Sequence, residues 1–267
     1  MLSLALAGIA LVVMVTLIVR RMILDMLARR RAEQRKKLMT AILGWLDAEE
    51  ATELPIQPGQ PLGSRLAMEL LQLVRGRDRA RLITLMRETG TDAELCARIR
   101  SGGAAERIEA ARALALFATP ETLWALEDGL DDPNPEVRLT VAASLVTLQA
   151  APPLPTLVAK LAIGSIEHSR TLSPIFRELA RNRKNEFVAA LSDPEMSEPV
   201  LVLMLDALGR TGDYRLIEAV GNVTAHPSMD VRAEALRALG AFGHPAATPI
   251  VLRAFDDPAW QVRAQAA

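Results

Sequence analysis

The sequence predicts an all-α fold: an α-solenoid of helical hairpins preceded by a single transmembrane helix. Apolar residues recur at helical spacing through most of the 267-residue chain, and short motifs return about every 31 residues after residue 100. The N-terminus holds a long uncharged stretch. No alternating apolar and polar run is long enough for a convincing strand, and aromatic residues make up only 3% of the chain. This composition favours closely packed short helices over a sandwich or barrel.

The first expected element is a membrane-spanning helix over Leu2–Val19, eighteen consecutive residues without a charge. Such a helix is about 27 Å long, close to the hydrocarbon thickness of a bilayer. No basic residue precedes this stretch, whereas Arg20 and Arg21 follow it directly. A cleaved secretory signal peptide has the opposite order of charges. We therefore expect a retained, single-pass anchor in the cell membrane.

A cluster of basic residues lies only on the C-terminal side of this stretch. Positive residues favour the cytoplasmic side of a membrane, so the N-terminus is expected outside and the rest of the chain in the cytoplasm. Contact with anionic lipid headgroups is an alternative role for the cluster, beside that of a topology signal. Its members are Arg20, Arg21, Arg29, Arg30, Arg31, Arg35, Lys36 and Lys37.

Two further segments are expected between the anchor, residues 1–37, and the repeats. Residues 38–62 predict a helix and then a linker, because Leu54–Leu62 contains three prolines and a glycine. Residues 63–100 have helical spacing that is out of register with the later motifs. We expect them to form an irregular N-terminal helical cap on the exposed end of the solenoid.

Residues 101–267 are expected to form the solenoid, with about five units and an incomplete sixth. The heptapeptide Asp132–Arg138 returns as His226–Arg232 and as Asp257–Arg263, and the last two are 31 residues apart. The last unit stops inside its first helix, so we expect a fragment of a longer repeat protein. First helices are expected near residues 105–118, 135–149, 167–181, 196–210 and 229–242, and second helices near 120–130, 155–163, 184–191, 213–223 and 246–255.

The unit that begins at His226 shows the helical pattern most clearly. Val231, Ala235 and Phe242 fall on one apolar stripe of its first helix. On that helix we expect Leu239 to be buried and Glu234 to be exposed. A pair of helices this short cannot bury its apolar faces alone, so each pair must stack on its neighbours.

Arginine and aspartate recur at matching places in successive units. A charged groove is one explanation, but a repeated position is what a structural element of the architecture requires. We therefore expect an Asp–Arg ladder that ties each inter-repeat turn to the next helix. Its members are Arg107, Arg138, Arg170, Arg232 and Arg263, with Asp132, Asp193 and Asp257.

These motifs resemble the HEAT repeat family, in the short-repeat branch named after the phycobilisome lyases. The residues that carry the resemblance are Asp132–Arg138, Asp257–Arg263 and Ala238–Gly240, and it covers residues 101–267. It implies a stack of helix pairs whose second helices line the concave face. It is specific for the fold rather than the function, because the family contains scaffolds, adaptors and a few enzymes.

Two units depart from the family pattern. Glu198-Pro199 stands where other units have Val-Arg, and the unit near Gly164 lacks the Asp-Pro pair. A local irregularity or a bend in the stack is expected at these places.

No enzymatic chemistry, cofactor or metal is expected. His168, His226 and His244 fall in different units or opposite turns, whereas a metal site needs clustered ligands. The family's hydroxylases hold iron with His-Glu pairs, and this chain has only the reverse order, Glu167-His168. The single Cys96 has no cysteine partner, and no phosphate-binding glycine loop or Ser/His/Asp motif appears.

A protein partner is the interaction that the sequence favours. Nucleic acid is not expected, because the residues after Lys37 include 23 basic and 30 acidic ones. We expect a membrane-anchored scaffold or adaptor whose partner could itself be an integral membrane protein. The alternatives are an accessory subunit of a membrane enzyme complex and, disfavoured, a lyase- or hydroxylase-type enzyme. Candidate partner-binding residues are Trp124, Tyr214, Arg215 and Arg253 on second helices and Trp260 in a turn.

Overall fold

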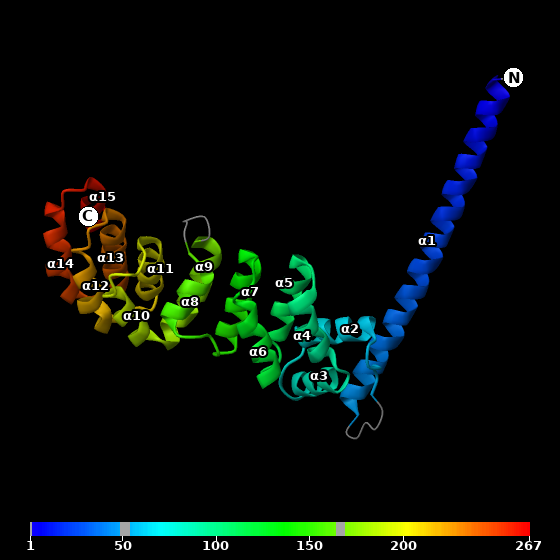
Figure 1. Ribbon diagram of the computed structural model, residues 1–267, viewed down its shortest axis with the longest axis horizontal. Coiled ribbons are helices and arrows are strands. Elements are labelled where there is room, and N and C mark those ends of the chain that lie inside the picture. Colours follow the sequence, from blue (N-terminus) through cyan, green and yellow to red (C-terminus); the bar gives the residue numbers. More distant parts are fainter. Residues whose placement is uncertain (1, 49–53, 164–168) are drawn as a thin grey trace. The chain divides into compact units, whose positions relative to one another are not determined.

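All regular secondary structure is helical in the part of the chain that the computed structural model describes, residues 2–48, 54–163 and 169–267 (Figure 1). The side chains of residues 2–13, 15, 31, 61 and 169–171 are outside this description. The chain divides into two compact units, Met1–Glu94 and Leu95–Ala267. The prediction of an all-α fold is confirmed for the described residues.

The N-terminal unit consists of one long helix and shorter helices that pack on its C-terminal part. Ile42 and Leu46 of the long helix are buried there, whereas its described side chains between Met14 and Arg30 are exposed. Ile56, in the expected linker, is also buried. The helices are α1 (Leu2–Asp47), α2 (Pro61–Leu71), α3 (Gly76–Glu88) and the first residues of α4 (Thr91–Ser101).

Arg81 closes the C-terminal end of α1. Its guanidinium group donates hydrogen bonds to the carbonyl oxygens of Trp45, Leu46 and Ala48 at 2.8, 2.9 and 2.7 Å. The same group lies 4.6 Å from the centroid of the Trp45 ring. The last carbonyl groups of a helix have no partner within it, so these bonds satisfy groups that would otherwise need water.

The predicted membrane anchor is contradicted. Within the described residues, no helix is both long and apolar enough to cross a membrane. The described side chains of α1 begin at Met14, and the exposed charged residues Arg20, Arg21, Asp25, Arg29 and Arg30 follow soon after. The apolar stretch among the described side chains is therefore too short for the hydrocarbon thickness of a bilayer. The predicted localisation, a single pass through the cell membrane with the N-terminus outside, is therefore wrong, and the membrane topology from which the cytoplasmic placement of the repeats was inferred falls with it.

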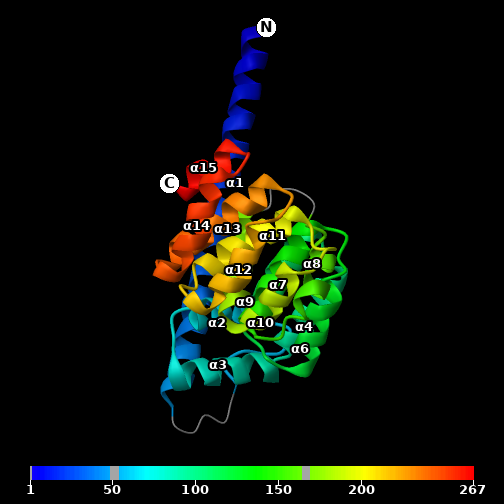
Figure 2. The same ribbon diagram turned by 90° about the vertical axis from the view of Figure 1, so that its left-hand side faces the viewer.

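The C-terminal unit is a stack of helix pairs, in which each first helix packs on the first helix of the next pair (Figure 1). Seen along the stack in Figure 2, the successive pairs overlap one another. The first helices are α5 (Ala104–Leu114), α7 (Pro135–Thr147), α9 (Ser169–Asn182), α11 (Glu198–Gly209) and α13 (Met229–Phe242), followed by α15 (Trp260–Ala266). The second helices are α6 (Pro120–Gly129), α8 (Leu154–Leu161), α10 (Lys184–Leu191), η2 with α12 (Tyr214–Leu216, Ile217–Val223) and η3 with α14 and η4 (Pro245–Ala247, Thr248–Arg253, Ala254–Asp256). These bounds confirm the predicted helix pairs.

Local sequence explains where these helices begin and end. At the start of α7, the Asn134 side chain accepts a hydrogen bond from the backbone N–H of Glu136 at 2.8 Å, and Pro135 has no N–H that needs a partner. At the end of α13, Gly243 adopts a left-handed conformation with φ of 61°. Glycine reaches that conformation without a steric penalty, so the chain turns there into the second helix.

The first helices α11 and α13 approach each other closely, and this corrects one predicted burial. Leu239 is 1% exposed, as expected, but Glu234 is only 3% exposed, so its predicted exposure is wrong. A Cβ atom added to Gly209 would lie 2.9 Å from the Cα atom of Ala238. Because Glu234 lies one turn before Ala238 on the same helix, this close approach covers it.

Candidate functional site

Arginine–aspartate ion pairs link neighbouring units in two places. The Nε and Nη2 atoms of Arg232 on α13 each donate to the Asp257 carboxylate at 2.8 Å. Arg107 on α5 forms an ion pair with Asp132, in which Nη2 donates to Oδ1 at 3.1 Å and Nε lies 2.7 Å from Oδ2. In both pairs the aspartate lies 25 residues after the arginine, in the turn that leads to the next first helix.

Each of these aspartates also organises its own turn. Oδ1 of Asp132 accepts the backbone N–H of Asn134 at 2.8 Å, and Oδ1 of Asp257 accepts that of Ala259 at 2.8 Å. The hydrogen bonds from Arg232 hold the pKa of Asp257 below its ordinary value, and the same bonds raise the pKa of the Arg232 guanidinium. The pairs are largely buried, which gives them a structural role. Asp–Arg pairs are thus found at two positions of the predicted ladder, but each aspartate pairs with the arginine of the preceding first helix, whereas the sequence predicts a pair with that of the next helix.

Other members of the predicted ladder contact the backbone of the turn. Arg263 donates to the carbonyl oxygens of Asp257 and Pro258 at 2.7 and 2.9 Å. Asp193 accepts the N–H of Glu195 at 2.9 Å. The side chain of Arg170 is outside the described residues. These contacts fix the turn in which each unit begins.

A surface groove of about 620 Å³ lies along the second helices α10 and α12. It has both polar and apolar walls, which suits a peptide segment with a mixed surface. Its lining residues are Lys184, Asn185, Val188, Ser192, Asp213, Arg215, Leu216, Glu218, Ala219 and Asn222.

The Lys184–Asp213 ion pair bridges the two sides of this groove. Nζ of Lys184 donates to Oδ2 of Asp213 at 2.5 Å. This hydrogen bond, together with the N–H of Arg215, lowers the pKa of the Asp213 carboxyl, so it carries a negative charge at neutral pH. Asp213 also caps the start of η2 through that N–H. The pair therefore neutralises itself, and Arg215 and Glu218 supply the remaining charges along the wall.

An aromatic stack stands next to the groove. Tyr214 is 54% exposed, and its ring lies 4.9 Å from that of His244, with 14° between the two planes. Nδ1 of His244 accepts the backbone N–H of Ala246 at 3.2 Å, which fixes the imidazole. Tyr214 thus presents one ring face to solvent in a fixed orientation, and this lowers the entropy cost of a contact there.

The structure brings only two of the five sequence-predicted partner-binding residues together, Tyr214 and Arg215. Trp124 lies on α6 and is 67% exposed, well before this groove in the stack. Arg253 ends α14 and Trp260 begins α15, where Trp260 is 65% exposed. All five side chains are exposed, but they do not form one continuous site.

Buried charge on the first helices was missed by sequence reasoning. Glu234 pairs with Arg237 one turn later on α13, and Asp206 of α11 contacts both Arg177 and Arg210. Burial raises the pKa of Glu234 above its ordinary value, although the Arg237 charge opposes this. The small residue Gly209 facing α13 was the available sequence signal for this burial.

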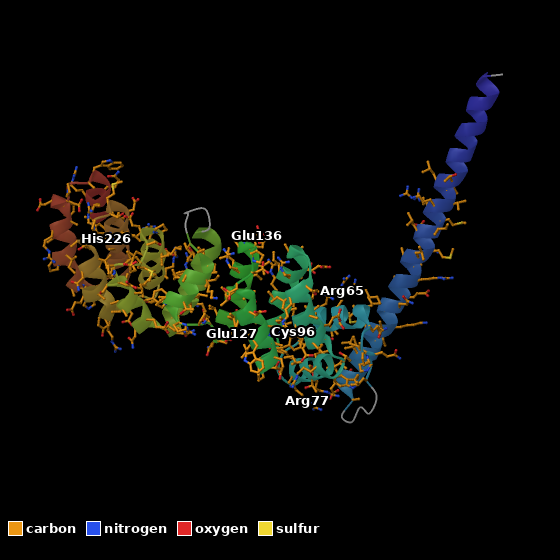
Figure 3. The ribbon with its side chains drawn as sticks, in the orientation of Figure 1. Arg65, Arg77, Cys96, Glu127, Glu136 and His226 are labelled. Atoms are coloured by element: carbon orange, nitrogen blue, oxygen red, sulfur yellow. The ribbon has the colours of Figure 1, made fainter. Side chains whose placement is uncertain are left out.

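The histidines and the cysteine do not form a common site. His226 stands where other units have aspartate, and its Nδ1 accepts the N–H of Ser228 at 3.1 Å. Cys96 is buried in α4, and Figure 3 shows it several helices away from His226. His168 is outside the described residues. Among those that are described, no group of three or more His, Cys, Asp or Glu side chains could hold a metal ion.

Solved structures with a similar arrangement of helices include human deoxyhypusine hydroxylase in complex with glycerol, at 19% identity, with 88% of this chain and 95% of that chain covered and a TM-score of 0.31. A designed armadillo repeat protein in complex with the peptide (KR)4 is 18% identical, with 86% of this chain and 96% of that chain covered and a TM-score of 0.28. The CpcE–CpcF complex of phycocyanin lyase from Nostoc is 21% identical, with 81% of this chain and 79% of that chain covered and a TM-score of 0.25. These values assign no activity to the chain.

A search of curated proteins finds no match. A family model described as HEAT repeats matches residues 93–166 and 185–267. The matched residues are more than half of the chain, and they contain both arginine–aspartate pairs and most of the helices of the stack, α9 excepted. The protein therefore belongs to the HEAT repeat family.

Proposed function

We propose that this protein is a binding scaffold whose HEAT-repeat surface holds another protein. The observation that carries the proposal is the exposure of large aromatic side chains on the C-terminal unit. The chain has nine aromatic residues in all, and four of them, Trp124, Tyr214, Phe255 and Trp260, are exposed there. Exposed aromatic and arginine side chains are typical anchors of protein interfaces.

The groove beside α10 and α12 is the proposed centre of this interface. Tyr214 is held by its stack on His244, and Arg215 lines the groove next to it. A partner segment in the groove would cover the Tyr214 ring and meet the guanidinium group of Arg215. Trp124, Arg253 and Trp260 would then make separate contacts along the same stack.

The proposed function is binding without chemistry of its own, and the proposed partner is a protein rather than a nucleic acid. The residues after Lys37 carry an excess of acidic side chains, and a phosphate backbone requires a basic surface. The lyase and hydroxylase alternatives make a separate prediction. Either a bound pigment or a bound metal would be found by absorbance and metal analysis of the purified protein.

Site-specific crosslinking tests the proposed interface. A photoreactive amino acid at Asn222, inside the groove, should crosslink one defined protein in the native cell extract. Tyr214→Ala combined with Arg215→Ala should reduce that product at least tenfold, because loss of two interface anchors removes more than about 1.4 kcal/mol of binding energy.

Arg112→Ala is the matched control, since Arg112 is exposed on the first helix α5. It should leave the yield of the crosslinked product unchanged. A product whose yield is the same in the Tyr214/Arg215 double variant and in the control would contradict the proposed interface.

A further inference from the structure

A tryptophan and four carboxylates share one exposed face of α6 and the turn that follows it. Trp124 is 67% exposed, although tryptophan side chains are mostly covered in folded proteins. Residues three, four or seven positions apart on a helix lie on the same face. The acidic residues at these spacings from Trp124 are all exposed, and Figure 3 labels one of them, Glu127. They are Glu121, Glu127, Asp128 and Asp131.

Only one of these four carboxylates is paired with a cation in the part of the chain that the structure describes. Asp131 forms an ion pair with Lys160, which lies on α8, the second helix of the next unit. Lys160 is the only charged residue of α8, so that helix supplies no further cation. The side chains of Glu121, Glu127 and Asp128 make no ion pair and no hydrogen bond with described residues. Three negative charges therefore remain open to a partner around the indole ring.

The combination of an exposed indole ring and unpaired carboxylates favours an arginine side chain as the occupant. A guanidinium group binds the face of an indole ring through a cation–π contact, and its planar N–H groups donate to both oxygens of a carboxylate. The same chain contains the first of these contacts, because the Arg81 guanidinium lies 4.6 Å from the centroid of the Trp45 ring. An acidic partner segment would instead be repelled by the three unpaired carboxylates.

Trp260 is a natural comparison, because it is also exposed but has different charged neighbours. Its exposed fraction is 65%. Of the acidic residues three or four positions away, Asp257 is already held by Arg232, and the charge of Asp256 is balanced by that of Arg263. An exposed indole ring is therefore common to both places, whereas the surplus of negative charge is found only at α6.

We propose that the α6 face around Trp124 binds an arginine-containing segment of the partner protein. One guanidinium group of that segment stacks on the indole ring and pairs with Glu127 or Asp128, and a second basic residue meets Glu121. This inference rests on the proposed scaffold function, and it adds the chemical character of one segment of the partner. The groove along α10 and α12 lies on other elements of the stack.

Titration of the full chain with a short peptide tests this assignment. The probe is acetyl-Gly-Arg-Ala-Arg-Gly-amide, and its counterpart has citrulline, which has a similar shape but no charge, in place of both arginines. The readout is the NMR signal of the indole N–H group of each tryptophan. The arginine peptide should shift the Trp124 signal in a saturable way, with a Kd of about 1 mM. The citrulline peptide should produce no saturable shift up to about 10 mM.

The other two tryptophans are controls within the same sample. The Trp260 signal should respond to the arginine peptide about tenfold more weakly than that of Trp124, because its surroundings lack the unpaired carboxylates. The Trp45 signal should not move, since Arg81 already occupies the face of that ring.

Two double variants test the part played by the carboxylates. Glu127→Gln with Asp128→Asn should weaken binding of the arginine peptide at Trp124 by about fivefold, because both substitutions remove a charge beside the ring. Glu109→Gln with Glu195→Gln removes two exposed charges elsewhere in the stack and should leave the Kd unchanged.

The proposal is overturned if the Trp124 signal shows no saturable shift up to about 10 mM arginine peptide, or if the citrulline peptide binds equally well. Equal affinities at Trp124 and Trp260 would also overturn it, because the exposed rings alone would then explain the binding. A response that appears only after Arg29→Gln and Arg30→Gln in α1 would assign the face to the chain's own basic residues, and this too would overturn it.

Failure of this inference is distinguishable from failure of the scaffold function. A Trp124 signal that ignores the arginine peptide, together with crosslinking that depends on Tyr214 and Arg215, removes only the arginine site on α6. A peptide response at Trp124 without such crosslinking removes the proposed groove and leaves the arginine site.

Discussion

Two carboxylates of the stack, Glu234 on α13 and Asp257 in the turn before α15, have opposite effects on stability. Asp257 receives two hydrogen bonds from Arg232 and one from the backbone of Ala259, so its charged form is stabilised. Glu234 is buried by the close approach of α11, and its pairing with Arg237 does not offset the loss of water. The first carboxylate therefore supports the fold at neutral pH, and the second opposes it.

Glu234→Gln should stabilise the protein at pH 7 by about 1 kcal/mol, because glutamine keeps a hydrogen bond to Arg237 without a buried charge. The pKa of Glu234 in the folded protein is raised above its ordinary 4.5. The charged side chain therefore lowers the free energy of unfolding increasingly as pH rises from 4.5 through the folded pKa, and it has no such effect below 4.5. Thermal melts should therefore separate the variant from the wild type at pH 7 and bring them together below pH 4.5. The exposed Glu109→Gln on α5 is the control. Equal effects of the two substitutions at pH 7 would show that burial of Glu234 is not the cause.

Asp257→Asn should destabilise the protein at neutral pH by about 1–3 kcal/mol, since it leaves Arg232 without a charged partner. The folded pKa of Asp257 is lowered below its ordinary 3.8, so the wild-type advantage is complete above that value and is lost as pH falls through the folded pKa. Urea unfolding of both proteins across this range measures the difference. Asp256→Asn, one residue earlier and exposed, should have little effect. If Asp256→Asn lowered the free energy of unfolding as much as Asp257→Asn, the loss of one negative charge, rather than of the ion pair with Arg232, would explain the destabilisation.

At the scale of the helices, the sequence predicts where each helix begins and ends, but not which faces of neighbouring helices pack together. Turn motifs such as Asp132-Pro133 and the apolar stripe at Val231 and Ala235 predict helix bounds, because caps and periodicity are local. The burial of Glu234 depends on α11, a full unit earlier. It arises from a tertiary contact that no local pattern records. The absence of an aspartate at Ile163 can be read from the sequence only after the structure shows that each paired aspartate follows its arginine by 25 residues. Ile163 follows Arg138 by the same interval.

The glycines of the two Ala-Leu-Gly motifs give a matched test of helix contact. Gly209 faces α13, where an added Cβ would lie 2.9 Å from Ala238 Cα, whereas one added at Gly240 meets nothing within 4 Å. Gly209→Ala should destabilise by about 1–3 kcal/mol through overpacking. Gly240→Ala should stabilise by about 0.5–1 kcal/mol, because alanine favours the helix. Chemical denaturation measures both, and the same sign for the two would contradict the predicted approach of α11 and α13.

For the whole C-terminal unit, stability is expected to come from contacts between neighbouring pairs. Each first helix packs on the next first helix in the stack, and the two ion pairs likewise join one unit to the following turn. The proposed binding surface depends on this arrangement, because the groove and the Tyr214–His244 stack are each formed by successive units. A stack of this kind behaves as a nearly one-dimensional system, in which a local defect acts mainly on its neighbours.

Hydrogen exchange of Leu239→Ala tests this central claim most directly. Leu239 is buried in α13, and its truncation should cost about 2–5 kcal/mol. The account predicts faster amide exchange in α11, α13 and α15, with exchange in α5 and α7 unchanged from the wild type. An equal acceleration through all helices of the C-terminal unit would contradict it and show that the unit unfolds as one cooperative body.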